Sequence, residues 1–218
     1  GENRMGGTFH REMRGPEQSG SSPTHYDPFA VMKDASKTAP DVDGSVRLPV
    51  DEHTDEATVI EAVRAWVEAH VPEAWRKAAH EGGPAAIRAV RTRADYEAWY
   101  PVFAHSGMVA PALPVEYGGL GVTNRMARII ENELRPYNLG RLNVLGLNLA
   151  APTLLAFGTE EQKRRFLPPI VRNEEVWCQL FSEPGAGSDL ASLATRAVRD
   201  GDDWIITGQK VWNTWAYL

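Results

Sequence analysis

The order of the periodic segments constrains the fold of this chain more than any other feature of the sequence. Apolar residues recur at helical spacing from about Asp55 to Pro169, and strand-like segments separated by a turn signal follow only after Val176. Strands therefore do not alternate with helices, which argues against a doubly wound parallel sheet. We expect an α+β fold in which an all-α bundle precedes an antiparallel β-domain.

Two helices are predicted in the first part of the periodic region. One begins at Asp55-Glu56 and ends near His80, because Gly82-Gly83-Pro84 follows. Its inward face is expected to consist of Ile60, Val63, Val67, Val71 and Trp75. The other stops at Gly107, and its aromatic side carries Tyr96, Trp99, Tyr100 and Phe103. Aromatic stripes at helical spacing are core far more often than cofactor-binding surface, so we expect these rings to pack inside.

Three further helices are expected before the strands begin. Thr123 is a suitable N-cap for a helix that runs to Pro136. The segment from Leu142 to about Phe157 is rich in Leu and Ala, and such a helix should be buried on most of its sides. Thr159 and Gln162 have the spacing of a capping box, which predicts the start of the last helix.

The strand region contains a polar, glycine-rich corner. Val176 to Phe181 has the pattern of an apolar strand, Ser182 to Asp189 forms the corner, and two more strands are expected around the turn signal Asp200-Gly201. Gly185 and Gly187 allow the backbone to approach a ligand closely, and the hydroxyls and amides nearby can donate hydrogen bonds to an anionic or carbonyl-rich group. The corner is therefore a candidate binding site.

Charge and motif content narrow the possible chemistry. The 218 residues carry a formal net charge of -6, which argues against nucleic-acid binding, and no apolar run is long enough to span a membrane. The single cysteine, Cys178, excludes an intramolecular disulfide and a cysteine metal cluster. No zinc-binding spacing, serine-hydrolase elbow or complete dinucleotide-binding glycine motif is present. We expect a cytoplasmic protein that binds no metal.

Two motifs resemble the middle-domain signature of the FAD-dependent acyl-CoA dehydrogenases. They are FSEPGAGSD, from Phe181 to Asp189, and GQKVWNT, from Gly208 to Thr214. The resemblance extends from about Glu56 to the last residue. It implies the N-terminal helical domain at 56–174 and the start of the middle β-domain at 175–218. Residues 1–55 lie outside it, and because they carry few periodic apolar positions we expect them to form a flexible N-terminal arm. The family's C-terminal helical domain is expected to be absent from this chain.

The resemblance also implies a reaction and a set of contacts. The reaction is α,β-desaturation of an acyl-CoA thioester, as in β-oxidation and other lipid metabolism, with hydride transfer to flavin N5 and onward transfer of electrons to an electron-transfer flavoprotein. The implied FAD contacts are Gln179, Phe181, Ser182, Gly187, Ser188, Trp212 and Thr214. The implied substrate contacts are Ser188 and Asn148. The alternative for Asn148 is a structural role, as a core amide whose hydrogen bonds are satisfied within the protein. A homodimer or homotetramer is expected.

No catalytic residue is expected in this chain, because the family's catalytic glutamate lies in the C-terminal domain. Glu183 belongs to the corner motif and is not expected to be the base. Trp212 should lie in a strand and offer a stacking ring, with Thr214 two residues on and on the same side of the sheet. Gln179 stands where the family often has an aromatic residue, and Asn213 is unusual beside Thr214, so the acyl specificity is left open.

The sequence is compatible with three functions. The first is an acyl-CoA dehydrogenase. The second is an acyl-CoA oxidase or flavin monooxygenase of the same superfamily, which peroxide release would identify. The third is a non-catalytic acyl-CoA-binding scaffold, which tight binding without turnover would identify. A free strand edge at Trp212 to Leu218 is expected to pair with other sequence or with a partner.

Overall fold

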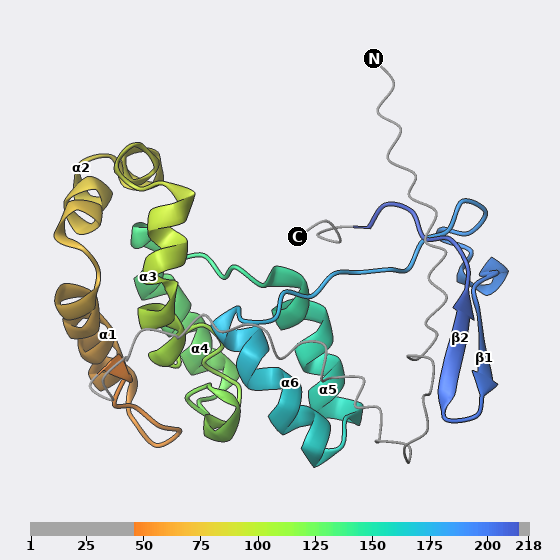
Figure 1. Ribbon diagram of the computed structural model, residues 1–218. Helices are drawn as coiled ribbons and strands as arrows, with labels where there is room; N and C mark the ends of the chain where they lie inside the picture. The colour runs from red at the N-terminus through yellow and green to blue at the C-terminus, as the bar shows by residue number, and fades with distance from the viewer. Residues whose placement is uncertain (1–45, 214–218) are drawn as a thin grey trace, which may run out of the picture. The chain divides into compact units, whose positions relative to one another are not determined.

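The computed structural model describes residues 46–213, which form a helical unit (46–177) and a smaller unit (178–213) that contains a β-hairpin (Figure 1). The helical unit contains α1 (Glu56–His70), α2 (Glu73–Val90), α3 (Arg93–His105), η3 (Val115–Tyr117), α4 (Asn124–Leu134), η4 (Arg135–Tyr137), the π-helix η5 (Gly146–Ala150), α5 (Ala151–Phe157) and α6 (Glu160–Arg172). The smaller unit contains η6 (Leu190–Ser192), β1 (Arg196–Asp200) and β2 (Asp203–Thr207). The predicted α+β class, with helices before an antiparallel sheet, is confirmed.

The first predicted helix is in fact two helices. α1 ends at His70 because Pro72 forces the residue before it out of the helical region, and Val71 is extended with φ -81° and ψ 129°. α2 starts at Glu73 and runs past the predicted end to Val90, with a kink at Gly82 and Gly83. Gly83 has φ +60°, a conformation that glycine adopts without strain. The prediction of one unbroken helix was therefore wrong at Pro72, whereas the predicted interruption at Gly82-Gly83 is present as a kink after which the helix continues.

Side-chain caps define the starts of α3, α4 and α6. Thr123 accepts a hydrogen bond from the Met126 N–H at 3.2 Å and begins α4, as predicted. The predicted capping box of α6 is also present, with Thr159 and Gln162 each bonding the other's backbone N–H. An equivalent box between Thr92 and Asp95 begins α3. Such caps fix helix starts because they satisfy N–H groups that the helix itself leaves unpaired, and two of these three, at Thr123 and Thr159, were predicted.

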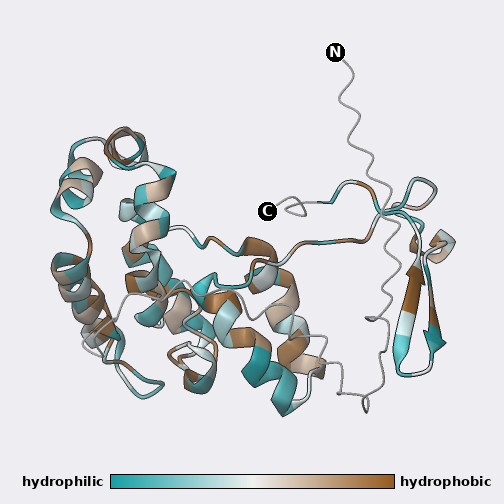
Figure 2. Ribbon diagram, viewed as in Figure 1, coloured by the Kyte–Doolittle hydropathy of each residue, from teal (hydrophilic) through white to brown (hydrophobic). Residues whose placement is uncertain are grey.

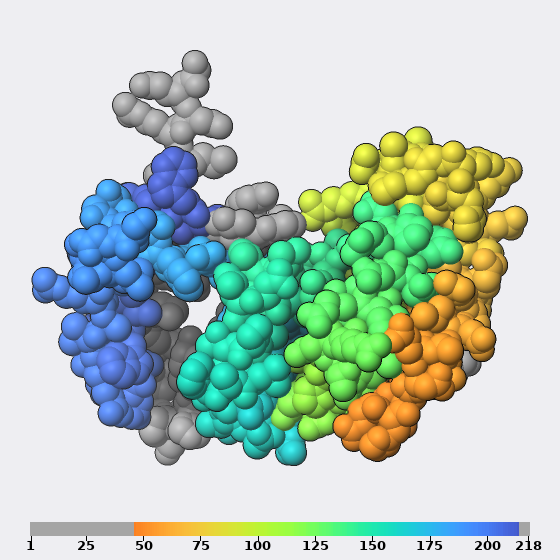
Figure 3. Space-filling model, turned by 180° about the vertical axis from the view of Figure 1, so that it is seen from behind, coloured from red at the N-terminus to blue at the C-terminus, as the bar shows by residue number. Residues whose placement is uncertain are grey.

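An aromatic cluster packs α1, α2 and α3 together. The Trp75 and Trp99 rings meet edge to face at a centroid distance of 5.3 Å, and Trp99 stacks on Phe103 at 6.2 Å. The Arg91 guanidinium lies 4.4 Å from the centroid of the Tyr96 ring. The prediction that the aromatic stripe is core is confirmed. α1 also packs against α4, as the orange and green surfaces of Figure 3 show.

The segment predicted as one buried helix from Leu142 to Phe157 has a wider turn at its centre. In η5 the Ala151 N–H bonds the carbonyl of Gly146, five residues back, just before Pro152. Within the described residues one side of this helix is exposed, including Phe157, which is 86% exposed. The prediction that this helix is buried on most of its sides was therefore wrong for the described residues, because an apolar helix face is buried only where other segments pack against it.

β1 and β2 form an antiparallel hairpin with Val198 opposite Ile205. The two-residue loop begins with Gly201, whose φ of +63° suits the first position of a hairpin turn, so the turn predicted at Asp200-Gly201 is confirmed. Both strands are exposed along their whole length, although Figure 2 shows hydrophobic residues in β2. Packing on either face is absent among the residues described here.

Two strand predictions are not borne out. The segment from Val176 to Phe181 belongs to no strand, because within 46–213 it finds no ladder partner. Trp212 lies beyond β2, which ends at Thr207, and its φ of +58° is left-handed rather than extended. Side-chain alternation along a strand therefore does not apply to it. Thr214, and most of the predicted free edge up to Leu218, lie outside the described residues.

Candidate functional site

The glycine-rich corner begins with a tight turn. The N–H of Glu183 donates to the carbonyl of Ala186 at 2.8 Å, and the N–H of Ala186 donates back to Glu183 at 3.1 Å. Pro184 and Gly185 form the tip of this turn, where proline's restricted φ favours the second turn position. Ala186 is buried, whereas Gly187 and Ser188 beyond it are exposed. The turn therefore presents the later part of the corner to solvent.

Glu183 is the buried polar group around which the corner is held, with only 8% of the residue exposed. Its carboxylate accepts hydrogen bonds from the N–H groups of Ala194 at 2.7 Å and Thr195 at 3.1 Å, and from the Thr195 hydroxyl. The Lys210 ammonium group lies 2.8 Å from the same carboxylate. We call Glu183, Thr195 and Lys210 the Glu183 cluster.

The donors of the Glu183 cluster keep this carboxylate ionised. The hydrogen bond from Lys210, followed by those from Thr195 and Ala194, lowers the pKa of Glu183 to about 2. A carboxylate with such a pKa and four donors around it is a poor proton acceptor. The geometry agrees with the expectation that Glu183 is not a catalytic base.

The chain that leaves β2 lies beside the corner. The Lys210 ammonium group donates to the carbonyl of Phe181 at 3.1 Å, and the Val211 N–H donates to the carbonyl of Ser182 at 2.9 Å. Gly208 approaches Thr195 so closely that an added Cβ would lie 2.2 Å from the threonine hydroxyl. Residues 208–211 therefore pack tightly against both the corner and the entry to β1.

These contacts bring together some of the residues predicted to bind a flavin. Because Val211 bonds Ser182, the next residue, Trp212, is held near Phe181 and Ser182. Phe181 and Trp212 are 57% and 88% exposed. Gln179 is partly buried in the extended segment before the corner. Thr214 lies outside the described residues.

The corner offers backbone donors that no acceptor in the described part of the chain uses. Among residues 46–213, the N–H groups of Gly185, Gly187 and Ser188 have no protein acceptor. A Cβ added at Gly185 or Gly187 would meet no atom within 4 Å, so the space beside this backbone is open. N–H donors of the corner together with the exposed rings of Phe181 and Trp212 on the two adjoining segments fit a flat, carbonyl-rich ring such as the isoalloxazine of FAD.

Asn148, the predicted substrate contact of the helical unit, is exposed on η5. The satisfied core amide of this region is Asn143 instead, which is 1% exposed. Its hydrogen-bond partners are the carbonyls of Ile170 and Glu175 and the N–H groups of Gly146 and Trp177. The alternative prediction, that Asn148 is a satisfied core amide, was therefore wrong. Asn143, at the start of the same helix, has that role.

Thr195 and Lys210 were not among the residues predicted for this site. The available signal was the charge pattern, since a glutamate in the corner and a lysine just after β2 flank a hairpin whose ends must meet. Opposite charges at the two ends of a hairpin are expected to pair. Residue type and spacing could thus have indicated this ion pair, although not its burial.

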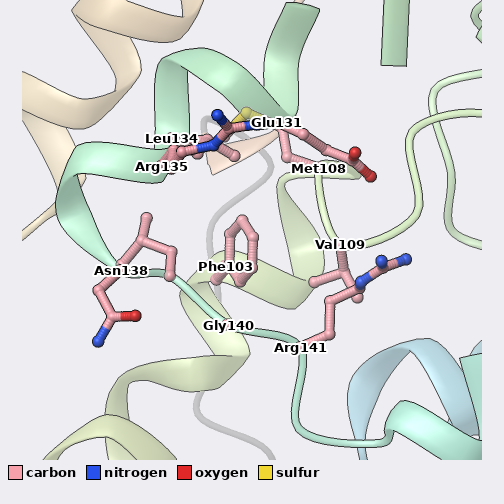
Figure 4. Close-up of a pocket in the computed structure, with 10 residues that line it drawn as sticks. Phe103, Met108, Val109, Glu131, Leu134, Arg135, Asn138, Gly140 and Arg141 are labelled. Carbon is pink, nitrogen blue, oxygen red and sulfur yellow. The ribbon is translucent and has the colours of Figure 1, made fainter. Parts of the chain in front are cut away.

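Two hollows lie among residues 46–213, and of the corner glycines singled out in the sequence only Gly185 lines one of them, whereas none of the predicted flavin or substrate contacts does. A hollow of about 500 Å³ lies between the turn at Glu183–Ala186 and the ends of β1 and β2. Another, of about 320 Å³, lies in the helical unit, where Glu131, Arg135, Asn138 and Arg141 surround Phe103 (Figure 4). Phe103 is only 2% exposed, so this second hollow offers little apolar contact.

Other kinds of site find no support in the described part of the chain. Across residues 46–213, histidine, cysteine and acidic side chains nowhere gather in threes in a way that could hold a metal ion. In the same residues, every helix is too short or too polar to cross a bilayer.

Comparison with known proteins identifies the helical unit. Residues 53–174 match the family model described as acyl-CoA dehydrogenase, N-terminal domain. The acyl-CoA dehydrogenase IpdE1 of Mycobacterium tuberculosis is 42% identical over 157 residues, which cover 72% of this chain and 40% of that relative. The chain thus spans about two fifths of the length of this curated relative.

Solved structures agree with this match. The ChsE4-ChsE5 complex from Mycobacterium tuberculosis has a TM-score of 0.50 and 34% identity, over 72% of this chain and 38% of that chain. A variant of the Tcur3481-Tcur3483 steroid ACAD has a TM-score of 0.50 and 32% identity, over 71% of this chain and 39% of that chain. The order of a helical domain followed by an antiparallel sheet is thus found in proteins of similar sequence.

Proposed function

This chain belongs to the acyl-CoA dehydrogenase family, and from that premise we propose that it supplies part of the flavin- and substrate-binding region of an FAD-dependent acyl-CoA dehydrogenase. The observation that carries the proposal is the corner itself. Its N–H groups at Gly185, Gly187 and Ser188, which have no acceptor among residues 46–213, lie in the same stretch as the exposed ring of Phe181. Trp212 is held beside that stretch by the bond between Val211 and Ser182.

In this proposal the residues of the corner bind and orient the cofactor. Phe181 and Ser182 contact the flavin, with Gln179 and Gly187 beside them, and Trp212 packs next to the ring. Ser188 reaches both the flavin and the thioester arm of the substrate. Thr214 donates a hydrogen bond near N5, and Asn148 contacts the acyl group. Such preorganised donors act on the substrate and cofactor mainly by positioning.

The proposed reaction forms a double bond between Cα and Cβ of the acyl group. The α-proton leaves to a base as the β-hydrogen leaves with its electron pair, and FAD, when bound, supplies the acceptor for that pair. Since the Glu183 carboxylate is already occupied by Lys210 and Thr195, we assign the base to the C-terminal helical domain of the family. An electron-transfer flavoprotein is the proposed electron acceptor.

The similar structures suggest which substrate and assembly to test first. One of them is titled a steroid ACAD, so we propose a steroid or similarly bulky acyl-CoA as the first substrate class. The other is a complex of two named chains, so assembly with an unlike chain should be tested beside the homodimer and homotetramer.

The test is an anaerobic visible spectrum of the full-length protein with FAD, before and after addition of acyl-CoAs. We expect the flavin band to bleach, and to bleach faster with a steroid side-chain thioester than with a straight-chain one. A protein that takes up no FAD would contradict the proposal. Bleaching followed by peroxide release in air would instead indicate an oxidase.

A further inference from the structure

The Glu183 cluster joins three separate stretches of chain through one carboxylate. These are the turn that contains Glu183, the residues Ala194 and Thr195 that lead into β1, and Lys210 after β2. The connections span 11, 12 and 27 positions in sequence. The carboxylate therefore fixes where the corner lies relative to both ends of the hairpin.

Lys210 and its neighbour carry this constraint to the residues proposed to face the flavin. The Lys210 ammonium group bonds Glu183 and also the carbonyl of Phe181, at 2.8 and 3.1 Å. The Val211 N–H holds the carbonyl of Ser182 at 2.9 Å. The backbone at two proposed flavin contacts is thus held by residues whose own position depends on Glu183.

The packing around the cluster leaves little room for adjustment. A Cβ at Gly208 would lie 2.7 Å from the Cβ of Thr195 and 2.9 Å from its Cα. Real Cβ atoms are not found so close to other atoms, so the two segments are in direct contact. A change in the cluster would therefore move the corner rather than be absorbed locally.

The cluster has an unusual setting for a purely stabilising ion pair. Among the described residues of the smaller unit, Glu183 and Ala186 are the buried ones, and both strands are exposed. A buried ion pair gives little net stability, because removing the two charges from water offsets their attraction. Its better-attested role is to select one geometry among several.

We propose that Glu183 is a positioning residue for the flavin site, which acts through Lys210 and Thr195 to set the backbone of Phe181 and Ser182. This inference rests on the proposed function. Glu183 touches neither substrate nor cofactor in this scheme. It determines how well the corner donors are aimed, so its removal should affect flavin binding and spectrum more than folding.

The test uses full-length protein with FAD and four variants. Glu183→Gln and Lys210→Met remove one partner of the ion pair, whereas Lys210→Arg keeps the positive charge. Asp202→Asn is the matched control, because it removes one negative charge from the exposed hairpin loop of the same unit. The FAD dissociation constant and the shape of the visible flavin band are measured at a temperature where circular dichroism shows every variant folded.

Glu183→Gln and Lys210→Met should weaken FAD binding by about tenfold, which is the smaller loss seen when the hydrogen-bond partners of metal ligands are removed, and should change the flavin band. Lys210→Arg should restore most of the affinity, and Asp202→Asn should match the wild type. In anaerobic reduction by acyl-CoA, the rate should fall for Glu183→Gln while the substrate dissociation constant stays within about twofold.

Wild-type affinity and spectrum in Glu183→Gln would overturn the inference while leaving the proposed function intact. A wild-type protein that binds no FAD would instead remove the proposed function itself. If Glu183→Gln does not fold, Thr195→Val decides the matter, because it removes one donor and keeps the ion pair. Unchanged FAD binding in Thr195→Val and Lys210→Met would then overturn the inference.

Discussion

Two buried polar side chains, Asn143 and Glu183, each hold together segments that are distant in sequence. Asn143 uses both donors and its oxygen to join the start of its own helix to the end of α6 and the chain beyond it. Glu183 joins the corner to both ends of the hairpin. Each residue is buried because its partners satisfy it, and each should therefore be sensitive to small chemical changes.

Asn143→Leu should destabilise the helical unit by about 2 to 4 kcal/mol, because it leaves buried carbonyls and N–H groups without partners. Asn148→Leu is the matched control, since Asn148 is exposed and the same change there should cost less than about 0.5 kcal/mol. Urea unfolding followed by circular dichroism measures both. Equal losses in the two variants would show that Asn143 has no special role.

Glu183 should titrate far below an ordinary glutamate. Its pKa in the folded protein is about 2, against a usual value of 4.5, so the folded state favours the ionised form. The stability that its hydrogen bonds contribute is present above about pH 4.5 and is lost as the pH falls towards 2. The NMR shifts of the Ala194 and Thr195 amides, which bond this carboxylate, should inflect near pH 2. An inflection between pH 4 and 5 would contradict the observed hydrogen bonds.

At the scale of elements, contacts near helix ends decide how α2, α3 and η4 meet. Arg91, just after α2, lies over the rings of Trp75 and Tyr96 at 5.0 and 4.4 Å. Its guanidinium also donates to the carbonyls of Tyr137 and Asn138. One planar cation thus links three elements by stacking and hydrogen bonding at once.

Arg91→Lys should cost about 1 to 2 kcal/mol although it keeps the charge, because an ammonium group cannot stack on both rings and reach both carbonyls. Arg125→Lys is the control. Arg125 forms an exposed pair with Glu56 of α1, and such pairs contribute less than about 1 kcal/mol. Thermal unfolding of both variants tests the difference, and a loss for Arg91→Lys no larger than that for Arg125→Lys would contradict it.

At the scale of the whole molecule, the two units differ in how much they bury. The helical unit has an extended core that includes Val59, Val63 and Phe103, whereas β1 and β2 are exposed on both faces. A two-stranded hairpin without a covering layer is only marginally stable in water. The two units should therefore differ in local stability.

Hydrogen exchange of the 218-residue chain should show this difference directly. Amides of α1, α3 and α6 should exchange slowly, and those of β1 and β2 should exchange orders of magnitude faster, because opening the hairpin exposes little further surface. Mass spectrometry of peptides from each segment measures the rates. Protection in β1 equal to that in α6 would indicate that the hairpin has a covering layer in solution.

Local spacing allowed the sequence to predict much of this architecture. The caps at Thr123 and Thr159, the aromatic stripe of α3 and the hairpin turn at Gly201 each depend on residues within a few positions of one another. The break at Pro72 obeys the same kind of rule and was within reach of the sequence. The absence of the strand predicted at Val176–Phe181 could not be read from local spacing, because a strand forms only where it finds a pairing partner elsewhere in the chain.

The sequence by itself determined where helices begin, where the hairpin turns and which motif forms the corner, because these properties are set by neighbouring residues. Only the tertiary structure decided which polar side chains are buried. The partners of Asn143 lie up to 34 positions away and those of Glu183 up to 27, and no local pattern encodes such distances. A buried polar group is stable only where those distant donors and acceptors converge, so the fold, rather than residue type, separates Asn143 from Asn148.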